Sequence, residues 1–179
     1  FEETPAIRYG KRVHKACEEY IRDGVPLRKD MQEFDPILKA LREKEGEKIC
    51  EEKIALTEDL EKTTYFGKKV WLRGAADLLI LRGDSAFVVD YKTGSDKYPD
   101  VEQLEVMALM IWALYPEVET VHGGLIFLKT KKNITRKYTR TDDMERLEIR
   151  WRSKVKRLDE AFENDVWPPN PNGCPLTTA

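Results

Sequence analysis

Apolar and polar positions along the 179-residue chain recur with two different periods, which predict its helices and strands. An apolar stripe at helical spacing predicts a helix over residues 7–22, and a second helix is predicted over about 33–47. The pattern then changes to runs rich in Val, Ile, Leu and Phe. These runs predict three successive strands over 49–57, 70–82 and 85–92.

The second half of the chain continues with helix, strand, strand and helix. A helix over 101–114 is apolar almost all round, which predicts deep burial, and strands are predicted over 120–129 and about 134–140. A long helix over 142–164 is expected to carry one continuous core-facing stripe, made of Met144, Leu147, Trp151, Val155, Leu158 and Phe162. The order predicts an α/β fold in which helices flank a mixed sheet. The strand–helix–strand step between 92 and 120 predicts a right-handed crossover and a parallel pair.

Length and composition narrow the class of protein. A chain of 179 residues with 41% hydrophobic residues predicts a single folded domain. The longest apolar run, Val106–Leu114, has nine residues, far fewer than the ~20 of a membrane-spanning helix. Three scattered cysteines are too few for a disulfide framework, so we expect a cytoplasmic setting. The net charge of −2 argues, as a total, against a strongly basic nucleic-acid binder.

Two aspartates are predicted to face each other across a hairpin. Gly83-Asp84 suits a two-residue turn, because glycine readily adopts a positive φ there. In the register that this turn sets, Asp77 lies directly opposite Asp90, with Cβ atoms roughly 4.5–5.5 Å apart on one face of the sheet. Lys92 points to the same face because it lies two residues beyond Asp90.

Opposed carboxylates in such apolar surroundings repel each other, and three remedies exist. One carboxylate can take up a proton, a nearby cation can pair with them, or a divalent metal can bridge them. Oxygen ligands favour Mg²⁺ or Mn²⁺ over zinc. A plain ion pair with Lys92 is the structural alternative, and a three-residue turn would take the aspartates off a common face.

Polar residues on three other elements are further candidates. His14 and Glu18 are four positions apart and share one face of the first helix, although a lone helical histidine is more often a surface or core residue than a ligand. Glu52 lies on the first strand, in an acidic run that is equally typical of a solvated surface. Gln103 precedes the apolar part of the third helix, where it either reaches a site or caps the exposed end.

Together these motifs resemble the PD-(D/E)XK nucleases, specifically the RecB-like branch that includes lambda-type exonucleases. That branch shows a His on an N-terminal helix, an acidic residue on the first strand, GxxD, then DxKTG, then QxxxY on the next helix. The matching residues here are His14, Glu52, Gly74 with Asp77, Asp90 with Lys92, and Gln103. The resemblance covers about residues 9–128 and implies a restriction-endonuclease-like αβββαβ core. A basic C-terminal strand and helix, about 129–165, would follow it.

The resemblance implies a nuclease with one or two Mg²⁺ or Mn²⁺ ions against the scissile phosphate. The catalytic residues that it implies are Asp77, Asp90, Lys92, His14 and Gln103. The metal ligands that it implies are His14, Asp77, Asp90 and the Tyr91 carbonyl, with Glu18 and Glu52 as supporting candidates. Lys92 would orient or deprotonate the attacking water, or stabilise the transition state.

The sequence departs from the pattern of this branch at two places. Met107 stands where QxxxY has Tyr, so the role of that Tyr is absent or is taken by another residue. The stretch 172–175 resembles a tail that leads into the iron–sulfur cluster of some relatives. No second cysteine follows Cys174, so the residues present do not support a cluster.

Positive charge is concentrated near the C-terminus. From Lys129 to Arg157 the chain has 12 Lys and Arg against 4 Asp and Glu, a net +8, and the remainder is −10. Phosphate binding depends on such local charge rather than on the total. A solvated helix face is an equally good explanation. The DNA-binding candidates are Lys129, Lys131, Lys132, Arg136, Arg150 and Lys154.

These features favour a divalent-metal-dependent DNA nuclease, an exonuclease rather than an endonuclease, in DNA recombination, repair or processing. Its substrate would be single- or double-stranded DNA without sequence preference. A helicase or a strand-annealing protein is a candidate partner. Because the chain has no nucleotide-binding glycine loop, any ATP-driven unwinding would come from another chain. The alternative is a catalytically silent nuclease-fold module that binds DNA or protein. The full set of Asp77, Asp90 and Lys92 favours the enzyme, and the oligomeric state stays open.

Overall fold

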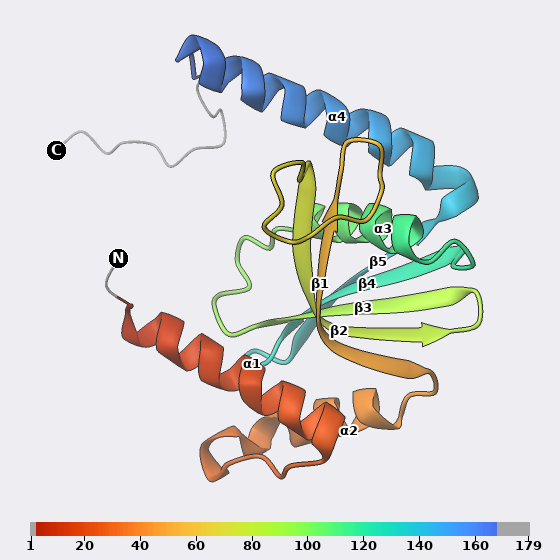
Figure 1. The fold of residues 1–179 in the computed structure, drawn as a ribbon. Helices are drawn as coiled ribbons and strands as arrows, with labels where there is room; N and C mark the ends of the chain where they lie inside the picture. The colour runs from red at the N-terminus through yellow and green to blue at the C-terminus, as the bar shows by residue number, and fades with distance from the viewer. Residues whose placement is uncertain (1–2, 168–179) are drawn as a thin grey trace, which may run out of the picture.

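In the computed structural model, which describes residues 3–167, a sheet lies between two layers of helices (Figure 1). The helices are α1 (Pro5–Asp23), the 3₁₀ helix η1 (Lys29–Phe34), α2 (Asp35–Glu43), α3 (Glu102–Leu114) and α4 (Arg140–Asn164). The strands are β1 (Glu47–Leu56), β2 (Leu72–Arg82), β3 (Ser85–Lys92), β4 (Thr120–Phe127) and β5 (Lys132–Thr139). Helices α1 and α2 cover one face of the sheet and α3 covers the other, with α4 outside α3 (Figure 1). The predicted α/β class is confirmed.

The sheet has the order β1-β2-β3-β4-β5 and is mixed. Strands β3 and β4 are parallel, joined across α3 as predicted, and the other neighbouring pairs are antiparallel. The β2–β3 hairpin has the predicted register, from Arg82↔Ser85 to Leu78↔Val89. Gly83 supplies the positive φ of the turn, 57°.

The sheet divides the hydrophobic core into two layers. The layer under α3 contains almost all of that helix, including the fully buried Leu109 and Ile111, which explains why its sequence is apolar all round. The layer under α1 is built on Val13, Cys17 and Ile21, one helical turn apart. His14, which follows Val13, is therefore held at the border of this buried stripe and is half-buried.

One predicted boundary and one predicted burial pattern are wrong. The second helix ends at Glu43 rather than near 47, because from Glu47 onward the chain forms β1 and pairs with β2. In α4 the apolar stripe does not stay in the core: Leu147 is fully buried, but Leu158 is 58% exposed and Phe162 is 77% exposed. The first part of α4 packs on α3 and β5, and its far end extends past them (Figure 1).

Within residues 3–167, no helix combines the length and the apolar character that a membrane crossing requires.

Candidate active site

The regular alternation of β1 and β2 breaks at one position in each strand. The β1–β2 ladder runs through every pair from Glu47↔Leu81 to Leu56↔Leu72 except the pair of Glu51 with Asp77. Glu51 has a positive φ of 55°, which a non-glycine residue rarely adopts. As a result, Asp77 and the adjacent Leu78 both lie on the α1 side, whereas strict alternation would separate them.

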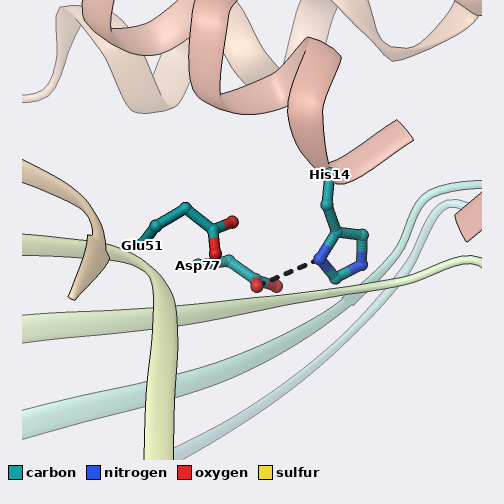
Figure 2. A group of neighbouring side chains, drawn as sticks. All are labelled: His14, Glu51 and Asp77. Carbon is teal, nitrogen blue, oxygen red and sulfur yellow. Dashed lines mark hydrogen bonds and ion pairs between the residues drawn. The ribbon is translucent and has the colours of Figure 1, made fainter. Parts of the chain in front are cut away.

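This break creates a cluster of three potential ligands under α1. One ligand atom from each of His14, Glu51 and Asp77 lies within 4.8 Å of the others. Figure 2 shows the three side chains pointing toward one another from α1, β1 and β2. The His14 Nδ1 lies 3.0 Å from the Asp77 Oδ1, and this hydrogen bond to Asp77 is the main reason that the pKa of His14 is raised. Burial, and next the charge of Asp77, raises the pKa of Glu51.

A second group lies on the α3 side of the sheet. The Lys92 Nζ is 2.8 Å from the Asp90 Oδ2 and also donates a hydrogen bond of 3.2 Å to the Gln103 Oε1. Gln103 is itself fixed, since its Nε2 donates to the carbonyl of Asp100. The ammonium of Lys92 is therefore held in one position between a carboxylate and an amide.

The two groups meet where β2 and β3 separate. Their ladder ends at Leu78↔Val89, and beyond it the backbone N–H of Tyr91 donates to the Asp77 Oδ2 at 2.6 Å. The prediction that Asp77 and Asp90 share one face is wrong, because the break in β2 turns Asp77 toward α1 while Asp90 lines a cavity against α3. The carboxylates still interact: burial and then the charge of Asp77 raise the pKa of Asp90.

The acidic residue of β1 that joins this site is Glu51, and Glu52 does not reach it. The positive φ of Glu51 places it beside Asp77, and Glu52 pairs with Ala76 on the neighbouring position of the ladder. Strict alternation could not have shown this. Glu18 lines the same hollow as His14 and Glu51, but it is paired with Lys15 at 3.0 Å, which lowers its pKa.

The residues present fit a divalent cation. A histidine nitrogen with two carboxylates is a donor set that a divalent metal ion can use. On the α3 side, the buried Asp90 Oδ2 lies 2.8 Å from the ammonium of Lys92, which compensates its charge. The fit to a metal ion therefore rests on the three-residue cluster under α1. That the Tyr91 carbonyl is also a metal ligand stays a prediction.

Sequence comparison decides the family. The pattern of the PD-(D/E)XK nuclease superfamily matches residues 1–178, almost the whole chain. The chain belongs to this superfamily. Its members are in general metal-dependent nucleases, in agreement with the three-residue cluster under α1.

More specific relatives are distant. No curated protein matches the chain. Among solved structures it is similar to one described as "Crystal structure of SSO0001", with 13% sequence identity and a TM-score of 0.43. That alignment covers 88% of this chain and 62% of the other, so the chain spans less than two thirds of the length of that protein.

In this member of the superfamily, Gly74 and Met107 line the α3-side cavity. A Cβ at Gly74 would lie 3.2 Å from the Met107 Sδ and 3.3 Å from the Met110 Sδ, so glycine lets β2 and α3 approach closely. The cavity has a volume of about 340 Å³ and is also lined by Asp90, Gln103 and Trp151. Met107, where Tyr was expected, is buried in the core and contributes no polar group to the site.

Five of the six basic residues that were candidates for DNA contact have a partner within this nuclease-superfamily chain. Arg150 and Lys154 on α4 form ion pairs with Glu102 of α3, and Arg150 also pairs with Glu105. Lys132 lies 3.4 Å from Asp96. The remaining three are placed as follows: Lys129 lies 4.4 Å from the Tyr9 ring centroid, Lys131 is exposed after β4, and Arg136 donates to the carbonyl of Thr135.

Two of the three cysteines lie within the described residues. Burial raises the pKa of Cys17 to about 12, so its thiol is inert at neutral pH, and Cys50 is half-buried on β1. Cys174 lies outside the described residues.

Proposed function

We propose that this chain is a divalent-metal-dependent DNA nuclease of the RecB-like branch, acting as an exonuclease in DNA recombination, repair or processing. The observation that carries the proposal is the meeting of two groups at the end of the β2–β3 ladder. His14, Glu51 and Asp77 offer ligands on one side, and Asp90 with Lys92 lies on the other. A helicase or strand-annealing protein is the partner that this role suggests.

His14, Glu51, Asp77 and Asp90 would hold one or two Mg²⁺ or Mn²⁺ ions. When bound, such an ion neutralises charge on the phosphate oxygens and makes water more acidic. Asp77 holds the imidazole of His14 in place, because one carboxylate oxygen is hydrogen-bonded to that ring and the other accepts from the N–H of Tyr91. These two hydrogen bonds fix the orientation of the Asp77 carboxylate, which keeps its negative charge for a metal ion.

Lys92 would place a positive charge beside the attacked phosphate. Its ammonium donates one hydrogen bond to the Gln103 Oε1. Another of its N–H groups can contact the attacking water or a phosphate oxygen. Asp90 keeps this ammonium close to the site at 2.8 Å. Gln103 acts through Lys92, as a positioning residue.

The proposal is tested on a panel of labelled DNA. Linear and circular molecules, single- and double-stranded, are incubated with Mg²⁺, Mn²⁺ or EDTA, beside a Lys92→Ala variant. We expect cleavage that requires metal, acts on linear but not circular DNA, and is lost in the variant. Metal-dependent cutting of circles would replace exonuclease by endonuclease. If the wild type cuts none of these molecules, the chain is a binding module on a nuclease fold.

A further inference from the structure

Two aromatic rings project from the connection between β1 and β2. The rings of Tyr65 and Phe66 meet edge to face, with centroids 5.1 Å apart and an angle of 86°. Phe66 is 83% exposed, so its ring contributes almost nothing to either layer of the core. Tyr65 is half-buried and holds the exposed ring of Phe66 at its edge, so the ring of Phe66 is a surface that another flat group can cover.

Two cations lie against these rings. The guanidinium of Arg73 is 5.7 Å from the centroid of each ring, and the Lys53 Nζ is 5.9 Å from that of Tyr65. Among the described residues 3–167, neither cation forms a salt bridge. In contrast, Arg150 and Lys154 are neutralised by Glu102. Lys53 and Arg73 therefore keep their charge available for an anion.

The same two cations lead to both sides of the candidate active site. Lys53 lines the open hollow that contains His14 and Glu51, and Arg73 lines the cavity that contains Asp90. Both belong to the part of the β1–β2 pair that continues past the end of the β2–β3 ladder at Leu78 (Figure 1). The rings and cations thus lie on the approach to the site.

We propose that Tyr65 and Phe66, with Lys53 and Arg73, form a stacking platform for unpaired bases of a single-stranded DNA end. The bases would stack on the rings while the cations contact the phosphates on either side. Bases in a duplex are already stacked on their neighbours, so the platform selects single strands. This inference rests on the proposed function and narrows its substrate.

The test compares DNA with and without bases. Binding of labelled oligo(dT) and of an abasic oligomer of equal length is measured by fluorescence anisotropy in EDTA, so that no cleavage occurs. For the Phe66→Ala variant we expect about tenfold weaker binding of oligo(dT), and unchanged binding of the abasic oligomer. Phe66→Trp should restore the oligo(dT) affinity. Phe162→Ala is the matched control, since Phe162 is 77% exposed on the far part of α4.

Two results would overturn the platform. One is equal affinity of the wild type for oligo(dT) and the abasic oligomer, and the other is an equal loss in Phe66→Ala and Phe162→Ala. Cleavage by the wild type with Mg²⁺ is measured separately. Loss of oligo(dT) binding in Phe66→Ala, together with no cleavage by the wild type, would keep the platform and reject the nuclease.

Discussion

The two sides of the sheet at the end of the β2–β3 ladder hold different chemistry. On the α1 side, His14, Glu51 and Asp77 form a group that can bind a cation. On the α3 side, Asp90 already has a cation, the ammonium of Lys92, which Gln103 fixes from α3. An ammonium among the three ligands would compete with a metal ion for their charge. The sheet separates the two cationic positions while keeping Asp77 and Asp90 electrostatically coupled.

Removing the charge of Asp77 is the strongest way to break this arrangement. Asp77→Asn keeps the size of the side chain and an acceptor for the Tyr91 N–H, but it removes a ligand charge. We expect DNA cleavage with Mg²⁺ to fall by roughly 10³-fold or more, because a metal ion contributes several kcal/mol to transition-state stabilisation. The melting temperature, followed by circular dichroism, checks that the fold persists. Activity within tenfold of wild type would place the metal elsewhere.

Removing the ammonium on the other side should affect a different kinetic quantity. For Lys92→Met we expect a fall in kcat of about 10²–10⁴-fold, because Lys92 acts on the reacting groups. Single-turnover cleavage measures this rate, and DNA affinity in EDTA serves as the control. A variant that loses affinity but keeps its single-turnover rate would make Lys92 a DNA anchor.

Two neighbouring glutamates test whether the break in β1 matters. Glu51→Gln should weaken activity by at least about 10–100-fold, because it removes a ligand and the loss of a group that only supports a ligand already costs this much. Glu52→Gln is the matched control and should stay within about twofold, since Glu52 lies outside the cluster. The Mg²⁺ concentration at half-maximal activity gives the comparison. A larger loss of activity in Glu52→Gln than in Glu51→Gln would contradict the break, because it would mean that Glu52, as regular alternation predicts, is the residue at the site.

The smallest expected effect concerns the ion pairs between α3 and α4. The hydrogen bond from Lys154 is the main cause that lowers the pKa of Glu102. Because this folded-state pKa is below the unfolded value, the pair stabilises the fold above about pH 4.5 and is lost as the pH falls through the folded pKa. Glu102 is 43% exposed, so Glu102→Gln should cost less than about 1 kcal/mol at pH 7 and almost nothing at pH 3.

Urea unfolding at both pH values measures this cost. Glu58→Gln provides the reference, because Glu58 is 79% exposed and its contact with Arg152 is 4.0 Å. An equal cost at pH 3 and pH 7 would show that Glu102 stabilises α4 by packing rather than by charge.

Most of the fold could be predicted from the sequence, because local signals agree with the tertiary structure. Gly83 marks the β2–β3 turn, and the turn fixes the register of the hairpin. Apolar residues on all sides of the helix over 101–114 correctly predicted that it is buried. The long helix was harder, since periodicity shows that Leu158 and Phe162 form a stripe but not whether anything covers it.

The candidate site was predictable only as far as alternation holds. Asp90 and Lys92 lie on one side as expected, because β3 is regular. Asp77 and Glu51 could not be placed, since the positive φ of Glu51 has no sequence signal such as glycine. The platform residues Tyr65 and Phe66 were missed because they lie in a connection without period. Their place beside Lys53 and Arg73 comes from the fold, since neither cation is near them in the sequence.

Binding of Mn²⁺, followed by electron paramagnetic resonance, tests the central claim most directly. Wild type, Asp77→Asn and Glu52→Gln are titrated with Mn²⁺ without DNA, so that the measurement depends on the ligands alone. The His14, Glu51 and Asp77 cluster predicts that wild type and Glu52→Gln bind Mn²⁺ alike and that Asp77→Asn loses this binding. Equal Mn²⁺ binding by all three proteins, or none by the wild type, would contradict a metal site under α1.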